Sequence, residues 1–155
     1  MHEHDQVQRA LDAVRALYDS NLAEFGTDSR AVGWPDARAQ VLRFEKLAYI
    51  LAADKPSEPV EVADWGCGYG AMFEFLDAHP ACDLRSFSGY DLSSDMLAAA
   101  AARIPDDRAS WICGPKVDRD VDYCFVSGTF NVRMDAEDET WNAYIKSTLE
   151  DLFAR

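Results

Sequence analysis

The segment VADWGCGYG at residues 62–70 carries the residues best suited to bind a small ligand. Its three glycines, Gly66, Gly68 and Gly70, directly follow a short apolar run and precede a helical pattern. Glycine allows a tight turn and lacks the Cβ atom that would keep a ligand away from the backbone. The N–H groups at the start of the following helix favour an anionic group. The segment therefore predicts a ligand-binding turn between a strand and a helix.

Two carboxylates accompany this turn. Asp91 comes 25 residues after Gly66, at the end of the next apolar run, where a carboxylate can accept both hydroxyls of a ribose. Asp64 comes two residues before the first glycine. A carboxylate there suits a ligand with an ammonium and a sulfonium, and it would repel a pyrophosphate. The pair favours S-adenosylmethionine (SAM), although the letters GCGYGA also satisfy the pattern for a nicotinamide dinucleotide.

The hydrophobic pattern predicts the elements that position these acids. Apolar residues at three- and four-residue steps predict helices over about 5–25, which Gly26 would end, and over about 36–53. From Val60 onward, short apolar runs alternate with helical segments. Strands are predicted at 60–65, 86–92, 109–113 and 121–128, and helices at 71–79, 93–103 and about 135–153. Ser93 or Ser94 would cap one helix and Asp135 the last one.

This order predicts an α/β fold with a Rossmann-like, doubly wound parallel sheet. We expect a helical extension or lid at 1–56 and a SAM-binding core at 57–155. The fourth strand resembles an interior strand, but the chain stops at Arg155 before any strand that the last helix could lead to. We therefore expect a core that is truncated after the fourth strand and its helix, with that edge covered by a homo-oligomer.

The net charge and the cysteine pattern of the chain restrict which classes of partner and site are expected. The chain has 155 residues and a formal net charge of −13, from 28 acidic and 15 basic residues. Such a surface repels phosphate backbones, so we expect neither nucleic acid nor a membrane as partner. The sequence shows no signal peptide or membrane span, which predicts a cytoplasmic protein. The four cysteines form no CxxC pair, and no metal site is expected.

These motifs together resemble those of class I SAM-dependent methyltransferases, and most closely small bacterial members with an N-terminal two-helix extension. The resemblance runs from about Tyr18 to the C-terminus. It rests on AVGW (31–34), QVLRFEKL (40–47), VADWGCGYG (62–70), GYDLSSDML (89–97) and DYCFVSGTFNV (122–132). It implies the class I methyltransferase fold, SAM as cofactor, S-adenosylhomocysteine as product, and methyl transfer to a small-molecule acceptor.

The resemblance also assigns residues to the cofactor. The methionine end of SAM would be lined by Asp64, Gly66, Cys67, Gly68 and Gly70. The ribose and the adenine would be contacted by Asp91, Leu92 and Met96. The reacting methyl group would face Ser127, Gly128 and Thr129. Arg43 is the candidate for a salt bridge to the SAM carboxylate, because arginine binds carboxylates in a bidentate fashion; the alternative is an arginine on an exposed helix surface.

Other features leave alternatives open. Asn131 and Tyr18 are candidates to contact the acceptor, or else they are a turn residue and a half-buried helix residue. Where related enzymes have an acid that binds adenine, this chain reads ICGP at 112–115, and Asp118 lies further along. Three functions fit: a small-molecule methyltransferase, a SAM-binding module without activity that needs a partner or self-association, and a fragment of a dinucleotide-binding oxidoreductase.

Overall fold

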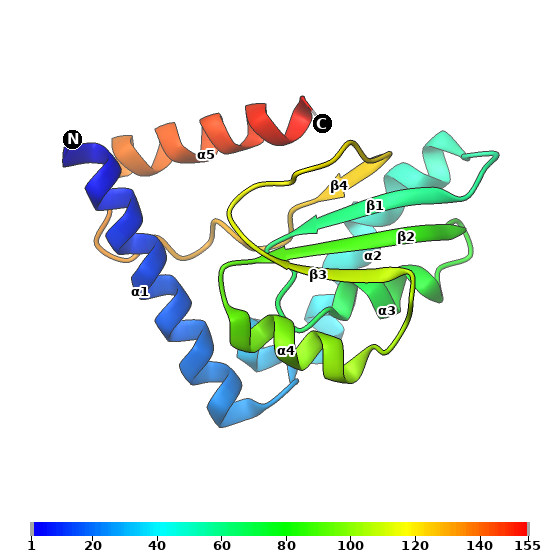
Figure 1. The fold of residues 1–155 in the computed structure, drawn as a ribbon, viewed down its shortest axis with the longest axis horizontal. Helices are drawn as coiled ribbons and strands as arrows, with labels where there is room; N and C mark the ends of the chain where they lie inside the picture. The colour runs from blue at the N-terminus through cyan, green and yellow to red at the C-terminus, as the bar shows by residue number, and fades with distance from the viewer. Residues whose placement is uncertain (1, 155) are drawn as a thin grey trace.

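The structure is a computed structural model that describes residues 2–154. Four strands form one parallel sheet in the order β3, β2, β1, β4 (Figure 1). They are β1 (Val60–Trp65), β2 (Leu84–Asp91), β3 (Ala109–Cys113) and β4 (Tyr123–Phe125). The chain places β2 and β3 on one side of β1 and then crosses to the other side for β4. This reversal of strand order at β1 confirms the predicted doubly wound α/β fold.

Helices connect these strands and precede them. Within the sheet region, α3 (Ala71–Asp77) follows β1, α4 (Ser94–Arg103) follows β2, and α5 (Asp138–Phe153) follows β4. Before the sheet come α1 (His2–Phe25), the 3-10 helix η1 (Ser29–Val32) and α2 (Ala37–Asp54). The α-helices lie where the apolar periodicity predicts them, apart from shifts at their ends. The helix η1 lies in a segment whose composition predicts a loop.

Each face of the sheet has its own apolar core. Val62 of β1 and Phe87 of β2 are fully buried on the face that α2 and α3 cover. Ala63 and Tyr90 point to the opposite face, where Leu152 of α5 packs. Burial of each large apolar side chain stabilises the fold by about 1.5–3 kcal/mol. The sheet is therefore held between helices on both faces, as a doubly wound fold requires.

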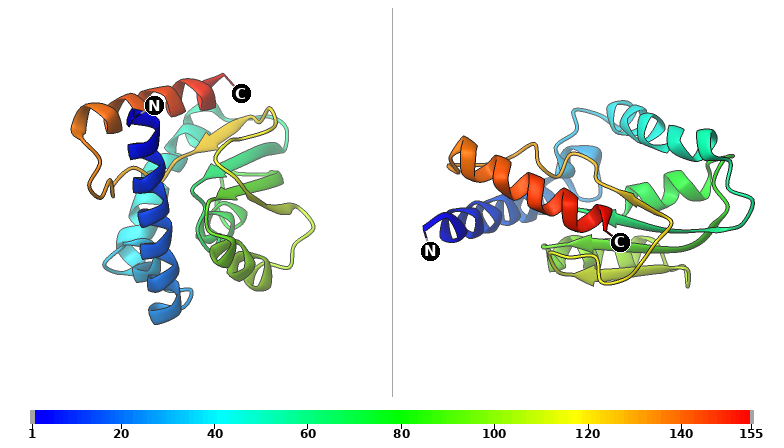
Figure 2. Two further views of the ribbon diagram at one scale, coloured as in Figure 1. Left: turned by 60° about the vertical axis from the view of Figure 1, so that its left-hand side comes forward. Right: turned by 90° about the horizontal axis from the view of Figure 1, so that it is seen from above.

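Helix α1 lies at one end of the sheet. The beginning of α5 lies beside the beginning of α1, and the end of α5 reaches back over the sheet (Figures 1 and 2). Ala10 of α1 and Trp141 of α5 are buried in one apolar cluster. The second half of α1 packs near Ala31 and Met96 instead. The hydroxyl of Ser93, at the start of α4, donates a hydrogen bond to the Asp19 carboxylate of α1. These contacts attach α1 to α5 at its beginning and to α4 in its second half.

The end of the sheet differs from the sequence prediction. The strand β4 covers three residues, where the apolar run predicts 121–128. After Phe125 the chain leaves the sheet and brings Thr129 against β1, where its hydroxyl donates to the carbonyl of Trp65 (3.0 Å). Gly128 has φ 73°, a left-handed conformation that glycine adopts readily. As predicted, β4 lies at an edge of the sheet within the described chain.

The helix caps test the sequence prediction at single residues. Ser93 rather than Ser94 caps α4, since its hydroxyl accepts from the backbone N–H of Met96 (3.0 Å). The prediction that Asp135 caps the last helix is wrong, because α5 begins three residues later and its N-cap residue, Glu137, makes no side-chain cap hydrogen bond. No helix within residues 2–154 combines the length and the apolar character that crossing a bilayer requires.

Candidate ligand-binding site

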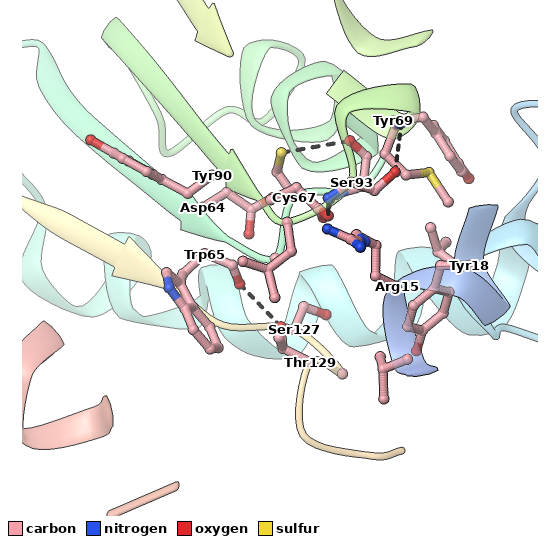
Figure 3. Close-up of a pocket in the computed structure, with 18 of the residues that line it drawn as sticks. Arg15, Tyr18, Asp64, Trp65, Cys67, Tyr69, Tyr90, Ser93, Ser127 and Thr129 are labelled. Atoms are coloured by element: carbon pink, nitrogen blue, oxygen red, sulfur yellow. Dashed lines mark hydrogen bonds between the residues drawn. The ribbon is translucent and has the colours of Figure 1, made fainter. Parts of the chain in front are cut away.

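A pocket lies over the carboxyl ends of β1, β2 and β4, at the point where the strand order reverses (Figure 3). Doubly wound folds bind ligands at this place. Residues of α1, η1, α2 and α5 complete its wall. The residues predicted from the sequence that line it are Tyr18, Asp64, Gly66, Cys67, Gly68, Asp91, Leu92, Met96, Ser127, Gly128 and Thr129. The remaining predicted residues, Arg43, Gly70 and Asn131, are not part of its wall.

Asp64 ends β1 as a buried carboxylate, 3% exposed, whose Oδ1 has no hydrogen-bond partner within the described chain. Burial raises the pKa of Asp64 to about 7, and the charge of the nearby Asp91 contributes to the same shift. A buried carboxylate oxygen without a partner costs free energy unless a cation or a donor approaches it. A cationic group of a ligand would therefore stabilise this oxygen.

Asp91 is oriented by the backbone around it. Its Oδ2 accepts from the N–H of Gly68 and its Oδ1 from the N–H of Ser93, both at 2.9 Å. Burial raises the pKa of Asp91, and these two N–H groups oppose the shift. Because each carboxylate oxygen has two lone pairs, each can accept one further bond from a ligand. The pKa of Tyr18 is raised by burial and also by the charge of Asp91, which lies nearby.

The glycines form the tight turn that the sequence predicts, but the space beside them is used differently. Gly66 has φ 83° and Gly68 φ 54°, so both adopt the left-handed conformation. A Cβ at Gly66 would lie 2.4 Å from Oγ1 of Thr129, and one at Gly68 would lie 2.8 Å from Cγ1 of Val32. Protein side chains, rather than open space for a ligand, therefore fill the room that the missing Cβ atoms leave. Gly70 likewise makes room for Trp111, at 2.6 Å.

The structure places a different arginine in the pocket from the one predicted. The guanidinium of Arg43 stacks over the Trp34 ring, 5.6 Å from its centroid, and Arg43 is exposed outside the pocket. Arg15 of α1 lines the pocket instead, and within residues 2–154 it is the only lysine or arginine that does so (Figure 3). Its spacing from Leu11 and Tyr18 gives a sequence signal, namely a cation within the apolar stripe of an amphipathic helix.

The other polar candidates have partners or lie elsewhere. Asn131 is exposed and does not line the pocket. Asp118 accepts a hydrogen bond from the hydroxyl of Tyr90, and the backbone turn at Gly114 lines the pocket in its place. Burial raises the pKa of the Cys67 thiol well above its usual value, so this thiol stays protonated. No cluster of three metal-binding side chains occurs among the described residues.

The chain is similar to proteins that are named as methyltransferases. No family model matches the chain. "Putative methyltransferase Rv1506c" of Mycobacterium tuberculosis is 40% identical over 99 residues, which are 63% of this chain and 58% of that protein. The methyltransferase domain of bacterial CtHen1-C has a TM-score of 0.50 with 20% identity, over 72% of this chain and 60% of that one. A SAM-dependent methyltransferase from Thiobacillus denitrificans, solved with S-adenosyl-L-homocysteine, has a TM-score of 0.42 with 26% identity. The match covers 55% of this chain and 36% of that one.

The CtHen1-C match shows that the chain has the Rossmann-like fold of class I methyltransferase domains. The chain spans 58% of the length of its Mycobacterium tuberculosis relative.

The buried carboxylate of Asp64 makes a prediction about stability. Its pKa is about 7 in the folded chain against 3.8 as the ordinary value, so the folded state holds the proton more tightly. The contribution of this group to stability is therefore greatest below pH 4 and is lost as the pH rises through 7. We expect Asp64→Asn to raise the free energy of unfolding of the ligand-free protein at pH 8 by up to about 4 kcal/mol. The gain shrinks toward pH 4.

Urea denaturation at several pH values measures this difference. The matched control is Asp107→Asn, which removes an exposed acid and should leave the pH dependence unchanged. A variant Asp64→Asn that is less stable than the original chain at pH 8 would contradict the assignment of Asp64 as a buried, unpartnered carboxylate.

Proposed function

We propose that the pocket binds S-adenosylmethionine and that the protein transfers the methyl group of SAM to a small-molecule acceptor. The observation that carries this proposal is the pair formed by the buried Asp64, near the end of β1, and the half-buried Asp91, at the end of β2. Asp64 leaves an oxygen without a partner, and SAM carries an ammonium and a sulfonium that suit it. A pyrophosphate would bring a second negative charge against it, so a dinucleotide fits poorly. The 40% identity to a protein named as a methyltransferase supports the same activity.

The roles of the other pocket residues are part of this proposal. The two oxygens of Asp91, already fixed by backbone N–H groups, accept the ribose hydroxyls. Leu92 and Met96 lie beside Asp91 and pack against the adenine. Gly66, Cys67 and Gly68 line the methionine end together with Asp64, while Ser127, Gly128 and Thr129 face the methyl group.

Arg15 takes the role that the sequence analysis assigned to Arg43. Its guanidinium has one ion-pair partner, Asp12, at 3.8 Å, and both side chains are about half exposed. Such a surface pair contributes little stability, so the guanidinium is available to a ligand. A carboxylate offers the planar, bidentate geometry that arginine binds best. The pocket then pairs the carboxylate of SAM with Arg15 and its two cationic groups with Asp64.

Bound SAM supplies an electrophilic methyl group on a sulfonium. The methyl carbon would bond to an acceptor atom as its bond to sulfur breaks, and that electron pair would stay on sulfur. A proton carried by the acceptor atom would leave to bulk water when the product is released. The protein contributes alignment and exclusion of water, which α1 and α5 provide by covering the pocket. The protonated Cys67 thiol has no role as a nucleophile.

Calorimetric titration with SAM, S-adenosylhomocysteine and NAD tests this proposal. We expect SAM and S-adenosylhomocysteine to bind and NAD not to bind. Asp91→Asn should weaken SAM binding by at least about tenfold, because it removes a charge-assisted acceptor worth roughly 1.5–3 kcal/mol. The control Asp95→Asn removes an exposed acid four residues along and should leave binding intact. Binding of NAD, or SAM affinity that survives Asp91→Asn, contradicts the assignment.

The role of Arg15 has its own test. We expect Arg15→Gln to weaken SAM binding about tenfold or more, while Arg43→Gln leaves it unchanged. The affinity for 5′-methylthioadenosine, which lacks the amino-acid part of SAM, should be the same in both variants and in the original chain. The opposite ranking of the two arginine variants would restore Arg43 as the carboxylate partner. An equal loss of methylthioadenosine affinity in Arg15→Gln would show a structural role instead.

We also propose that two copies of the chain associate through α2 and the free edge of β4. Among the described strands, β4 pairs on one side only. The end of α2 lies next to this strand, since the Tyr123 hydroxyl donates to Asp54 (3.0 Å). On the surface of α2, Leu42 is 53% exposed, Tyr49 73% and Ile50 46%. Exposed apolar surface beside an open strand edge favours coverage by another chain.

Light scattering at micromolar concentration measures this association. We expect a dimer for the original chain and a monomer for the double variant Tyr49→Lys/Ile50→Lys, because buried lysines at an apolar contact cost more than the contact provides. The control Glu45→Lys changes the charge of α2 at an exposed polar position and should leave the dimer intact. A monomeric original chain contradicts the proposal.

A further inference from the structure

An aromatic cluster forms one wall of the pocket, next to the residues that follow β4. It consists of Trp65 at the end of β1, Phe130 after β4, and Trp141 and Tyr144 of α5. The ring centroids are 5.3 Å apart for Trp65 and Phe130, 6.1 Å for Phe130 and Tyr144, and 5.1 Å for Trp141 and Tyr144. All of these rings except Phe130 line the pocket. The cluster therefore extends along the pocket from the end of β1 to α5.

The polar atoms of the two tryptophans are already used. The indole N–H of Trp65 donates to the carbonyl of Pro115 (3.0 Å), and that of Trp141 donates to the carbonyl of Phe130 (3.4 Å). Both rings therefore offer apolar surface to a ligand, and planar molecules bind well against such rings. Leu11 of α1 packs against the same cluster as Trp141 and also lines the pocket.

The one cation of the pocket is assigned to the cofactor. Within the described chain the charged side chains that line the pocket are Arg15, Asp64 and Asp91. In the proposed function Arg15 pairs with the carboxylate of SAM, Asp64 with its cationic groups, and Asp91 accepts from the neutral ribose hydroxyls. No cation is then left for an anionic acceptor, and burying an unpaired charge is costly. An acceptor without a formal charge therefore fits this pocket better than an anionic one.

A hydroxyl group without a partner lies beside this wall. The Oγ of Ser127, after β4, is buried and has no hydrogen-bond partner within the described chain. Figure 3 shows Ser127 close to Thr129 and Trp65. A buried hydroxyl without a partner gains free energy when a ligand supplies a donor or an acceptor. Ser127 is therefore the candidate hydrogen-bonding position for an acceptor bound against the aromatic rings.

We propose that the aromatic cluster of α5 and β1 forms the acceptor site, and that the acceptor is an uncharged, planar molecule whose single polar group bonds to Ser127. This inference rests on the proposed function, because it assigns the three charged residues to SAM.

Three compounds with the same two-ring skeleton test this proposal: 2-naphthol, 2-naphthoate and decahydro-2-naphthol. Each is titrated at pH 7.5 into the chain saturated with S-adenosylhomocysteine, and binding is followed by calorimetry. We expect 2-naphthol to bind at least about tenfold more tightly than the anionic naphthoate and than the saturated, non-planar alcohol. This preference follows from the missing charge partner and from the aromatic wall.

The variants Tyr144→Leu and Ser127→Ala separate ring contact from hydrogen bonding. We expect Tyr144→Leu to weaken 2-naphthol binding at least about tenfold, with affinity for S-adenosylhomocysteine unchanged. We expect Ser127→Ala to weaken 2-naphthol binding severalfold. The control Phe153→Leu replaces an aromatic residue of α5 that is 96% exposed and should change nothing. Unchanged cofactor affinity also shows that Tyr144→Leu is folded.

The outcomes distinguish this inference from the proposed function. Failure of S-adenosylhomocysteine to bind overturns the proposed function. If S-adenosylhomocysteine binds but 2-naphthol does not, or naphthoate binds as tightly as 2-naphthol, only the acceptor proposal is overturned. Naphthoate binding that is lost in Arg15→Gln would assign Arg15 to an anionic acceptor. No effect of Tyr144→Leu would place the acceptor away from the aromatic cluster.

Discussion

The burial of Asp64 beside Asp91 is the constraint on which the rest of the site depends. Two carboxylates at the ends of neighbouring strands raise each other's free energy, and one oxygen of Asp64 has no partner in the described chain. A fold that keeps this arrangement gives up stability in the ligand-free state. Such a cost at a pocket is typical of a group that is completed by a ligand. The acids thus explain why the ligand-free site is unfavourable in free energy.

The glycine turn holds Asp64 and Asp91 in place through packing as well as through backbone conformation. Thr129 and Val32 occupy the room next to Gly66 and Gly68, so the turn is connected to the segment after β4 and to η1. The N–H of Gly68 in turn orients Asp91. A substitution at either glycine would therefore disturb the acids and the wall of the pocket together, rather than only block a ligand.

Helices α1 and α5 give the pocket its individual character. The beginning of α1 packs with Trp141 of α5, and Asp19 attaches the second half of α1 to the start of α4. Arg15 and Tyr18 enter the pocket from α1, and Trp141 and Tyr144 enter from α5. These side chains distinguish the pocket from the strand ends alone, since they add a cation and aromatic surface to the two acids.

The sequence by itself determined the doubly wound fold, the turn at 66–70, the acids Asp64 and Asp91, and Ser93 as one of two caps, because each depends on residues close together in the chain. Only the tertiary structure decided which arginine enters the pocket, since Arg15 and Arg43 both lie on amphipathic helices and the packing of α1 and α2 separates them. Contacts between distant segments likewise decide that β4 is short, that Asp135 does not cap α5, and that the aromatic cluster forms. Periodicity reports which face of an element is buried, but the partner against that face is set by packing across the whole chain.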